Sequence, residues 1–287
     1  MFPSKFDYVV ADSIEEAIAA KAEGGDETRF LAGGQSLLPM MKIRLAAPVK
    51  LVDINRIPGL DHLERANGHL RVGALVRHAA VASSDLPGGA VASAAPWVAD
   101  PLVRNAGTLC GSVAHCDPEG DWNSVLLATG ADVVARGPNG ERTIPIEAFL
   151  DGMFTNALDD DEMVTEVRIR VPDGRWGGEY LKLERKIGDY ASVAAATHLE
   201  LDDAGVITRA GVALTSVYAH NLKVADAEAA LVGNTASDEL FAEAGEIAAR
   251  ACDPHSDVRG TADWKRQVVR TYVRRGLTAA ATQASGS

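Results

Sequence analysis

Apolar positions in the first part of the chain switch between helix and strand spacing. A capping box at Ser13-Ile14-Glu15-Glu16 opens a short amphipathic helix, and Gly24-Gly25 ends it. Residues 28–32 and 50–54 are short apolar runs typical of strands, with a turn and a helix-like stretch, residues 36–44, between them. This order predicts a β-α-β-like unit at the start of the protein.

Strand and helix patterns alternate through the middle of the chain. Trp122, Val125 and Leu126 fall on one side of an expected helix. The pattern predicts strands at residues 69–74, 132–136 and 164–171, and helices at residues 77–84 and 121–129. A Gly137-Pro138-Asn139-Gly140 turn ends the second of these strands.

The last part of the chain begins with strand-like segments and continues with helices. Strands are expected at residues 179–186, 191–201 and 206–214, and helices at residues 225–231, 237–249 and 261–280. Residues 280–287 are expected to fray, as chain ends commonly do. The change of pattern places a domain boundary near Gly174.

Composition and charge narrow the functional classes. The chain has 287 residues, 47% of them hydrophobic, so it can bury a core of its own. Its 28 basic and 40 acidic residues give a net charge of -12 without a basic stripe, which argues against a nucleic-acid partner. No apolar run approaches the ~20 residues of a membrane span, and the N-terminus is not typical of a signal peptide. We therefore expect a cytoplasmic protein.

The three cysteines are Cys110, Cys116 and Cys252. They lack the paired spacing of a zinc or iron–sulfur site, so we expect no metal in this chain. His115 precedes Cys116, but the sequence offers no acid to orient the histidine. Packing in a loop is therefore a better interpretation than a catalytic cysteine–histidine pair.

Two glycine-rich stretches are candidates for binding phosphate. One is Ala32-Gly33-Gly34-Gln35-Ser36-Leu37, and the other runs from Arg104 to Ser112 and again combines glycines with small polar residues. Residues without a Cβ let backbone amides approach an anion closely, and a helix N-terminus favours negative charge. Each stretch alone is more often an ordinary tight turn. Together they favour a ligand with a pyrophosphate between two larger halves.

Asp121 and the segment from Lys182 to Ala191 are further candidates. Asp121 stands at the expected start of a helix, where it either caps the helix or accepts hydrogen bonds from sugar hydroxyls of the ligand. The charged run that begins at Lys182 is typical of a solvated surface, yet it passes through Tyr190 into a small apolar stretch that must be buried. We therefore consider Lys182 as a cation that balances charge on a reduced ring, and Tyr190 as a side chain lying against that ring.

These motifs together resemble one protein family. The chain combines, in this order, Ala32-Gly33-Gly34-Gln35-Ser36-Leu37, Gly107-Thr108-Leu109-Cys110-Gly111-Ser112, Asp117-Pro118 with Asp121, and Lys182 to Ala191. This combination resembles the FAD-binding medium subunit of the molybdenum hydroxylases, the xanthine dehydrogenase family, and most closely that of aerobic carbon monoxide dehydrogenases. The resemblance covers essentially the whole chain.

The resemblance implies an α+β fold of the vanillyl-alcohol-oxidase type. FAD would lie between two α+β subdomains, and a third subdomain would contain a three-stranded antiparallel sheet with helices. On this chain the subdomains would span residues 1–57, 58–174 and 175–287.

The resemblance also implies which residues contact FAD. The first glycine-rich stretch would hold the pyrophosphate, the second the other side of the dinucleotide, and Asp121 the sugar hydroxyls. The full expected set is Ala32, Gly33, Gly34, Gln35, Ser36, Leu37, Ala99, Gly107, Thr108, Gly111, Ser112, Asp121, Met163, Lys182 and Tyr190. Of these, Met163 would touch the flavin, and Lys182 and Tyr190 would lie at the isoalloxazine ring and take the catalytic role. Relatives commonly have Gly-Gly-Asn at Cys110-Gly111-Ser112, which predicts altered FAD binding there.

In such complexes a large subunit carries the molybdenum cofactor and a small subunit carries two [2Fe-2S] clusters. The resemblance therefore implies that this chain receives electrons on FAD and passes them to a quinone-type acceptor. The assembly would be a dimer of heterotrimers, with a peripheral contact at the inner face of the cell membrane as one option. Carbon monoxide is the expected substrate of the complex. A subunit of an N-heteroaromatic or aldehyde hydroxylase, and a free-standing flavin oxidase, are the alternatives.

Overall fold

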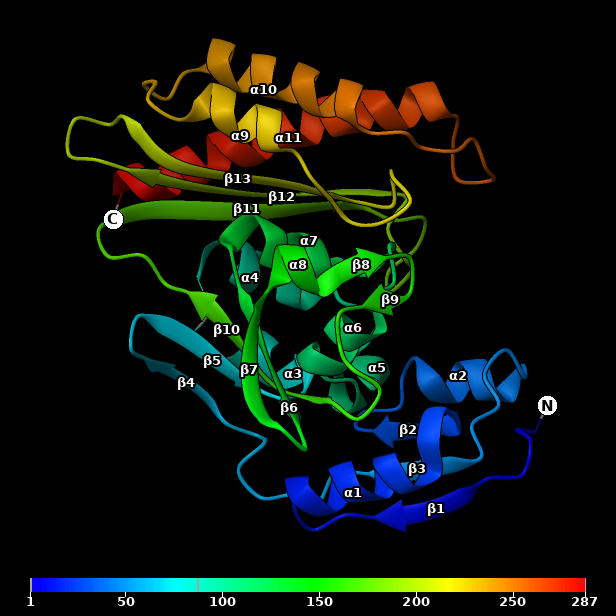
Figure 1. Ribbon diagram of the computed structural model, residues 1–287. Coiled ribbons are helices and arrows are strands. Elements are labelled where there is room, and N and C mark those ends of the chain that lie inside the picture. Colours follow the sequence, from blue (N-terminus) through cyan, green and yellow to red (C-terminus); the bar gives the residue numbers. More distant parts are fainter. Residues whose placement is uncertain (1, 87, 287) are drawn as a thin grey trace.

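The computed structural model describes residues 2–86 and 88–286. Figure 1 shows an N-terminal unit, a central unit and a C-terminal unit arranged one above another. Each unit is built around its own sheet, and a further pair of short strands joins the central unit. In the part of the chain that the structure describes, no helix is long and apolar enough to cross a bilayer.

The N-terminal unit is a small parallel sheet covered by helices. Its elements are β1 (Asp7–Val10), α1 (Ile14–Gly24), a 3-10 turn η1 (Gly25–Glu27), β2 (Thr28–Leu31), α2 (Leu37–Lys42) and β3 (Lys50–Asp53). β3 lies between β1 and β2 and is parallel to both. Ser13 caps α1 by accepting a hydrogen bond from the backbone N–H of Glu16, as the capping box predicted. The predicted β-α-β unit is confirmed, and β1 is a strand that the sequence pattern did not predict.

The central unit is an antiparallel sheet with helices on one side. Its elements are β4 (Leu63–Ala66), β5 (His69–Gly73), α3 (His78–Ser83), α4 (Gly89–Ala94), a 3-10 turn η2 (Ala95–Trp97), α5 (Pro101–Ala106), α6 (Leu109–His115), α7 (Asp121–Thr129), β6 (Asp132–Gly137), β7 (Gly140–Pro145), α8 (Ile146–Phe149), β8 (Leu150–Gly152), β9 (Thr155–Asn156) and β10 (Met163–Arg170). The strand order is β4-β5-β10-β6-β7. The predicted turn at residues 137–140 joins β6 to β7.

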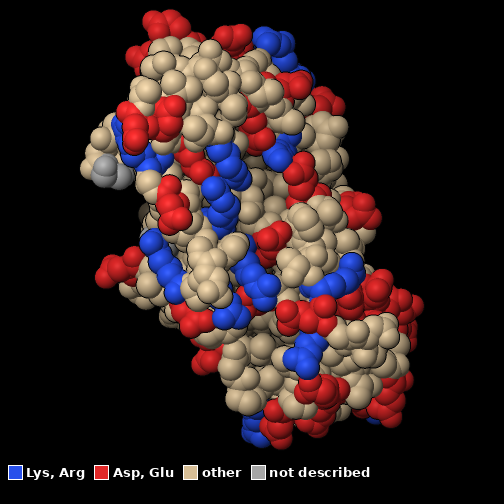
Figure 2. Space-filling view, turned by 60° about the vertical axis from the view of Figure 1, so that its left-hand side comes forward, with Lys and Arg blue, Asp and Glu red and all other residues tan. Residues whose placement is uncertain are grey.

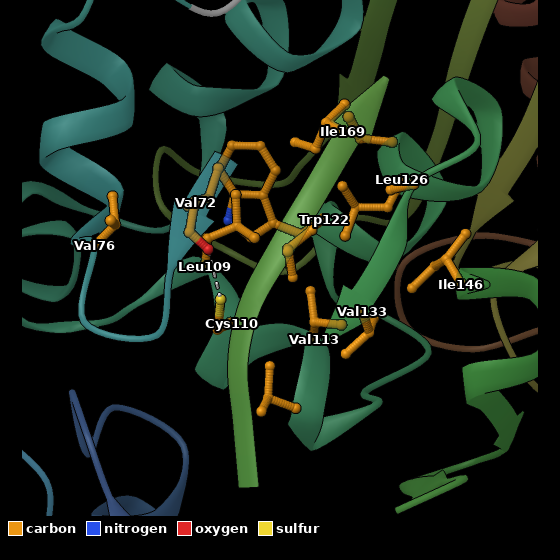
Figure 3. Packing of buried hydrophobic residues seen from close by; sticks show 14 of the residues in the cluster. Val72, Val76, Leu109, Cys110, Val113, Trp122, Leu126, Val133, Ile146 and Ile169 are labelled. Atoms are coloured by element: carbon orange, nitrogen blue, oxygen red, sulfur yellow. Dashed lines mark hydrogen bonds between the residues drawn. The ribbon is translucent and has the colours of Figure 1, made fainter. Parts of the chain in front are cut away.

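Side chains from the sheet and from α6 and α7 form the core of the central unit. Trp122 is fully buried there, together with Val72, Leu126 and Val133 (Figure 3). Burial of a large side chain of this kind removes apolar surface from water, and each Å² removed stabilises the folded state by about 25 cal/mol. The packing therefore holds α7, and with it Asp121 at its start, firmly against the sheet.

The C-terminal unit places an antiparallel sheet between two sets of helices. Its elements are β11 (Arg175–Leu183), β12 (Val193–Leu201), β13 (Ile207–Thr215), β14 (Leu222–Lys223), α9 (Ala225–Leu231), α10 (Asp238–Ala251) and α11 (Ala262–Gly286). α11 packs against β11 and β12, and α7 of the central unit packs against β12 and β13. Ala194 and Ala196 belong to the core shared with the central unit, whereas Val193 and Ala195 belong to the C-terminal core. β12 is thus buried on both faces, which explains its continuous run of small apolar residues.

Two details of the C-terminal unit correct the sequence prediction. The sheet has four strands rather than three, because the short β14 pairs with the end of β13. The expected fraying of residues 280–287 is wrong for residues 280–286, which complete α11; Ser287 lies outside the described residues. Ala280 and Ala284 are fully buried and one helical turn apart, so they pack into the C-terminal core and order the end of the helix.

Charges are distributed without a uniform basic surface on the face seen in Figure 2. Basic side chains concentrate in the middle of this face, with acidic side chains among them and toward both ends. Several arginines of β5 and β10 are paired with glutamates: Arg71 and Arg168 contact Glu166, and Arg170 contacts Glu200.

Candidate functional site

A cleft of about 1050 Å³ lies between the N-terminal and central units. Its walls come from the loop after β2, the segments around α5 and α6, the region from β9 to β10 and the loop between β11 and β12, which can be followed in Figure 1. Every residue expected to bind FAD lines this cleft except Lys182. The two glycine-rich stretches therefore face one cavity rather than opposite sides of the molecule.

The first glycine-rich stretch is a loop with free donors. Gly34 has a φ of +69°, in the left-handed region that favours glycine. Its carbonyl accepts from the N–H of Leu38 as the chain enters α2. Among the described residues, no backbone or side-chain acceptor pairs with the N–H groups of Gly34, Gln35 and Ser36. Unpaired amides in a left-handed turn form a concave anion site, so this loop can hold a phosphate group.

The second glycine-rich stretch is not a loop of this kind. Gly107 and Thr108 are the link between α5 and α6, and Gly111 and Ser112 lie inside α6. Thr108 caps α6 by accepting from the N–H of Gly111 at 3.0 Å, and the N–H of Gly107 donates to Val103 O at 2.7 Å. The N–H groups of Gly107 and Gly111 therefore already have partners, and the stretch lines the cleft as the capped start of α6.

The two stretches are joined by side chains that sequence reasoning did not single out. Asn55 Nδ2 donates to Ala32 O at 2.9 Å, and Arg77 Nη1 donates to Ala106 O at 2.5 Å. Arg77 Nη2 also donates to Asn55 Oδ1 at 2.6 Å. This chain of hydrogen bonds ties the loop after β2 to the end of α5. No local pattern marks either side chain, because their partners are far away in the chain.

Asp121 lies at the floor of the cleft and is not the cap of α7. Gly120 occupies the N-cap position, and Asp121 is the first residue inside the helix. Its carboxylate accepts from Tyr180 Oη at 2.6 Å and from Lys182 Nζ at 3.1 Å. Burial raises the pKa of Asp121, and Lys182 and Tyr180 work against that rise. Hydrogen bonds from Tyr180 and Lys182 therefore fix the position of Asp121, which lines the cavity.

Lys182 lies behind Asp121 and does not reach the cleft. Its side chain is 1% exposed, and its Nζ also donates to Trp97 O at 3.0 Å and lies 3.4 Å from Glu184 Oε2. Tyr180, Lys182 and Glu184 alternate along β11 and the residue after it. Because side chains two positions apart on a strand point to the same face, this spacing alone is a signal that groups Tyr180 and Glu184 with Lys182.

Tyr190 stands at the rim of the cleft, half-exposed, in the loop between β11 and β12. Gly188 in the same loop packs against Ala99 and Asp100 and has a φ of +84°. Burial, and then the carboxylates of Asp117 and Glu119, raise the pKa of the Tyr190 hydroxyl. Tyr190 thus offers a neutral aromatic ring to a ligand in the cleft.

The cysteines pack in the interior. Cys110 Sγ donates to Val72 O, shown as a dashed line in Figure 3, and Cys116 Sγ donates to Val113 O. Burial raises the pKa of Cys116 to about 12, so its thiolate is not populated near neutral pH. His115 packs its ring against Phe154, with 5.2 Å between centroids. Within residues 2–86 and 88–286, no cluster of histidine, cysteine, aspartate or glutamate has the arrangement of a metal site.

Comparisons with known proteins agree on one family. Residues 4–172 match the family described as the FAD binding domain in molybdopterin dehydrogenase, and residues 179–280 match the CO dehydrogenase flavoprotein C-terminal domain.

Similar proteins cover nearly the whole chain. The 6-hydroxypseudooxynicotine dehydrogenase complex subunit alpha of Paenarthrobacter nicotinovorans is 38% identical over 98% of this chain and 96% of its own length. The carbon monoxide dehydrogenase medium chain of Hydrogenophaga pseudoflava is 35% identical, covering 98% of each chain. A solved structure of that organism's carbon monoxide dehydrogenase, lacking the Mo-pyranopterin moiety of the molybdenum cofactor, matches with a TM-score of 0.94 and 37% identity, over 99% of this chain and 100% of its own. The expected family and α+β fold are confirmed.

Proposed function

Because this chain belongs to the family of FAD-binding subunits of molybdopterin dehydrogenases, we propose that it holds FAD in the cleft and relays electrons from a partner subunit to an external acceptor. The observation that carries the choice of site is the loop after β2. This loop has unpaired N–H groups and lines the same cavity as Asp121 and Tyr190. Backbone donors of this kind bind the oxygens of a diphosphate without adding buried cations.

The cavity fits a dinucleotide in size and chemistry. Ligand pockets commonly measure about 300–1,000 Å³, so a cleft of about 1050 Å³ suits a large cofactor. When bound, FAD supplies the redox chemistry, because it takes up and releases electrons. The residues of this chain bind the cofactor, orient it and set the charge around it.

We propose that different residues of the cleft contact different parts of FAD. The loop from Ala32 to Leu37 binds the diphosphate, and Asp121 accepts from sugar hydroxyls. Gly107, Thr108, Gly111 and Ser112 shape the wall next to this loop, and Ala99, Met163 and Tyr190 lie along the ring. Lys182 acts through Asp121 and is therefore a positioning residue. Its ammonium opposes the rise in the pKa of the buried carboxyl and fixes the position of the carboxylate by a hydrogen bond.

The partners follow from the same family membership. We propose that a large subunit carries the molybdenum cofactor and that a small subunit carries [2Fe-2S] clusters, with two such heterotrimers in the complex and a quinone as acceptor. We also propose three subdomains, residues 1–57, 58–174 and 175–287. The gap between the two family matches, after residue 172 and before residue 179, supports the second boundary.

Carbon monoxide is the substrate that we propose for the complex, supported by the similarity to carbon monoxide dehydrogenase in sequence and in structure. A second candidate is an N-heteroaromatic or related alkaloid, because the relative at 38% identity is a 6-hydroxypseudooxynicotine dehydrogenase subunit. The substrate would bind the large subunit in either case. Assaying the purified complex for dye reduction with carbon monoxide, and separately with N-heteroaromatic compounds, distinguishes the two.

The FAD site is tested on the isolated full-length chain. We expect one FAD per chain after titration, with the visible absorbance of a bound flavin and with weaker binding of riboflavin, which lacks the diphosphate. A chain that stays colourless in excess FAD would contradict the proposal. Copurification with subunits that contain molybdenum and iron tests the electron-relay role separately, because a free-standing flavin oxidase would purify alone.

A further inference from the structure

His78 lies where the two glycine-rich stretches meet. It is the first residue of α3, is 4% exposed and lines the cleft. A Cβ on Gly107 would stand 2.9 Å from His78 Nε2, so the Nε2 edge of the ring lies directly against this glycine. The backbone N–H of His78 donates to Gly107 O at 3.0 Å, which fixes the residue to the same point.

Trp122 determines which ring nitrogen of His78 carries the proton. Its indole Nε1–H donates to His78 Nδ1 at 3.0 Å, and Trp122 itself is fully buried. An indole nitrogen can only donate, so Nδ1 must act as the acceptor. In a neutral imidazole the proton must then reside on Nε2, the nitrogen at the cleft.

The ring is neutral under physiological conditions. Burial is the main cause, and the guanidinium groups of Arg104 and Arg77 add to it, so that the pKa of His78 is about 4. Among the described residues, no protein acceptor pairs with Nε2. His78 is therefore a buried polar side chain that presents one unpaired N–H to the cavity.

We propose that His78 donates this Nε2–H to a phosphoryl oxygen of the dinucleotide in the cleft, and that Trp122 holds the ring in the tautomer that makes the donation possible. The inference rests on the proposed function and extends it to a residue that no sequence motif identified. A neutral donor forms a charge-assisted hydrogen bond to phosphate without adding a buried cation. It also supplies a side-chain donor beside the backbone donors of the first loop.

The tautomer can be observed directly in the full-length chain. In the ¹⁵N-labelled, flavin-free protein, we expect the histidine ring spectrum of His78 to show the Nε2–H tautomer at neutral pH. Adding adenosine diphosphate, which has the diphosphate but no flavin, should shift the Nε2 resonance, whereas riboflavin should leave it in place. The Nδ1–H tautomer, or an Nε2 resonance that ignores adenosine diphosphate, would overturn the proposal.

Substitutions provide an independent measurement. His78→Leu removes the donor and should weaken binding of FAD and of adenosine diphosphate about ten-fold or more, the usual effect of losing a hydrogen bond to a charged group. His78→Gln keeps an N–H donor and should recover part of that affinity. His69→Leu, on β5 and outside the cleft lining, serves as the matched control and should bind FAD as the unaltered chain does.

The outcomes separate this inference from the proposed function. If the unaltered chain does not bind FAD, the proposed function fails. If the unaltered chain binds FAD and a folded His78→Leu variant binds it equally well, only the role of His78 is wrong. If His78→Leu does not fold, the tautomer and the response to adenosine diphosphate decide the question on the unaltered chain.

Discussion

The backbones of Gly33 and Gly107 are in direct contact. A Cβ built on Gly33 would stand 2.6 Å from the Cα of Gly107 and would overlap the carbonyl oxygen of Ala106. The two glycine-rich stretches touch through their backbones, so glycine is needed at Gly33 for packing between the stretches. This differs from the reason that the sequence suggested, which was the approach of amides to a phosphate.

Gly33→Ala should therefore separate the two walls of the cleft. We expect flavin retention to fall to a small fraction of the unaltered level and stability to decrease by about 1–3 kcal/mol, as is usual for overpacking. Flavin absorbance per chain and urea unfolding measure the two effects. Gly68→Ala is the control: it introduces strain at a φ of +74° but meets open space, so it should lower stability and leave FAD bound.

Gly34→Val should abolish flavin retention while the C-terminal helices stay folded. At a φ of +69° a β-branched residue is strongly disfavoured, and the added Cβ would stand 2.9 Å from Leu38 Cδ1. The loop must then change shape, which displaces its free N–H groups. Flavin content and the helical circular dichroism signal test this prediction, which stoichiometric flavin in the variant would refute.

Lys182→Met should destabilise the chain strongly. The substitution leaves the buried carboxylates of Asp121 and Glu184 without their cation, and breaking a buried pair in this way costs about 3–5 kcal/mol. The double variant Lys182→Met/Asp121→Asn should recover part of the loss, because only one carboxylate is left unpaired. Urea unfolding of the three proteins measures this, and a loss below about 1 kcal/mol in the single variant would disagree with the buried pair.

Tyr190→Phe should still bind FAD but change the environment of the flavin. Tyr190 lies at the rim of the cleft, so removing its hydroxyl alters polarity and access there without disturbing the core. The reduction potential of the bound flavin and the rate of reduction of an external quinone are the measurements. If both stay unchanged, Tyr190 does not lie at the edge of the flavin.

Glu200 should make stability depend on pH in the acidic range. Its burial would raise the pKa of its carboxyl, but hydrogen bonds from His198 and Arg170 outweigh burial and hold the pKa well below its ordinary value. A carboxyl with a lowered pKa in the folded state stabilises the protein above its unfolded pKa of about 4.3 and loses this contribution as pH falls below that.

Glu200→Gln should consequently be less stable than the unaltered chain at pH 7, and the difference should shrink between about pH 5 and pH 3. For each unit by which folding lowers the pKa of Glu200, the ionised carboxylate adds about 1.4 kcal/mol to the free energy of unfolding. Urea unfolding across this range provides the measurement. Glu64→Gln, which removes an exposed partner of Arg71, should differ from the unaltered chain by less than about 1 kcal/mol at any pH. A gap for Glu200→Gln that stays constant as pH falls would contradict this account.

Local spacing along the chain was enough to predict most helices and strands and the first glycine-rich stretch of the site. The capping box at Ser13, the strands around the first glycine-rich stretch and the buried β12 all follow from periodicity between near neighbours. The same holds for the family assignment, because the motifs keep their order and spacing. These features depend on interactions within a few residues, which a sequence displays directly.

Contacts between distant segments decided the rest. Gly33 meets Gly107 because the loop after β2 packs on the end of α5, and Lys182 reaches Asp121 because the sheet that contains β11 packs against α7 through β12 and β13. His78 acquires a defined tautomer only through Trp122, forty-four positions further on. Side-chain roles of this kind depend on which hydrogen-bond partners the folded chain brings within about 3 Å, and no local pattern encodes that distance.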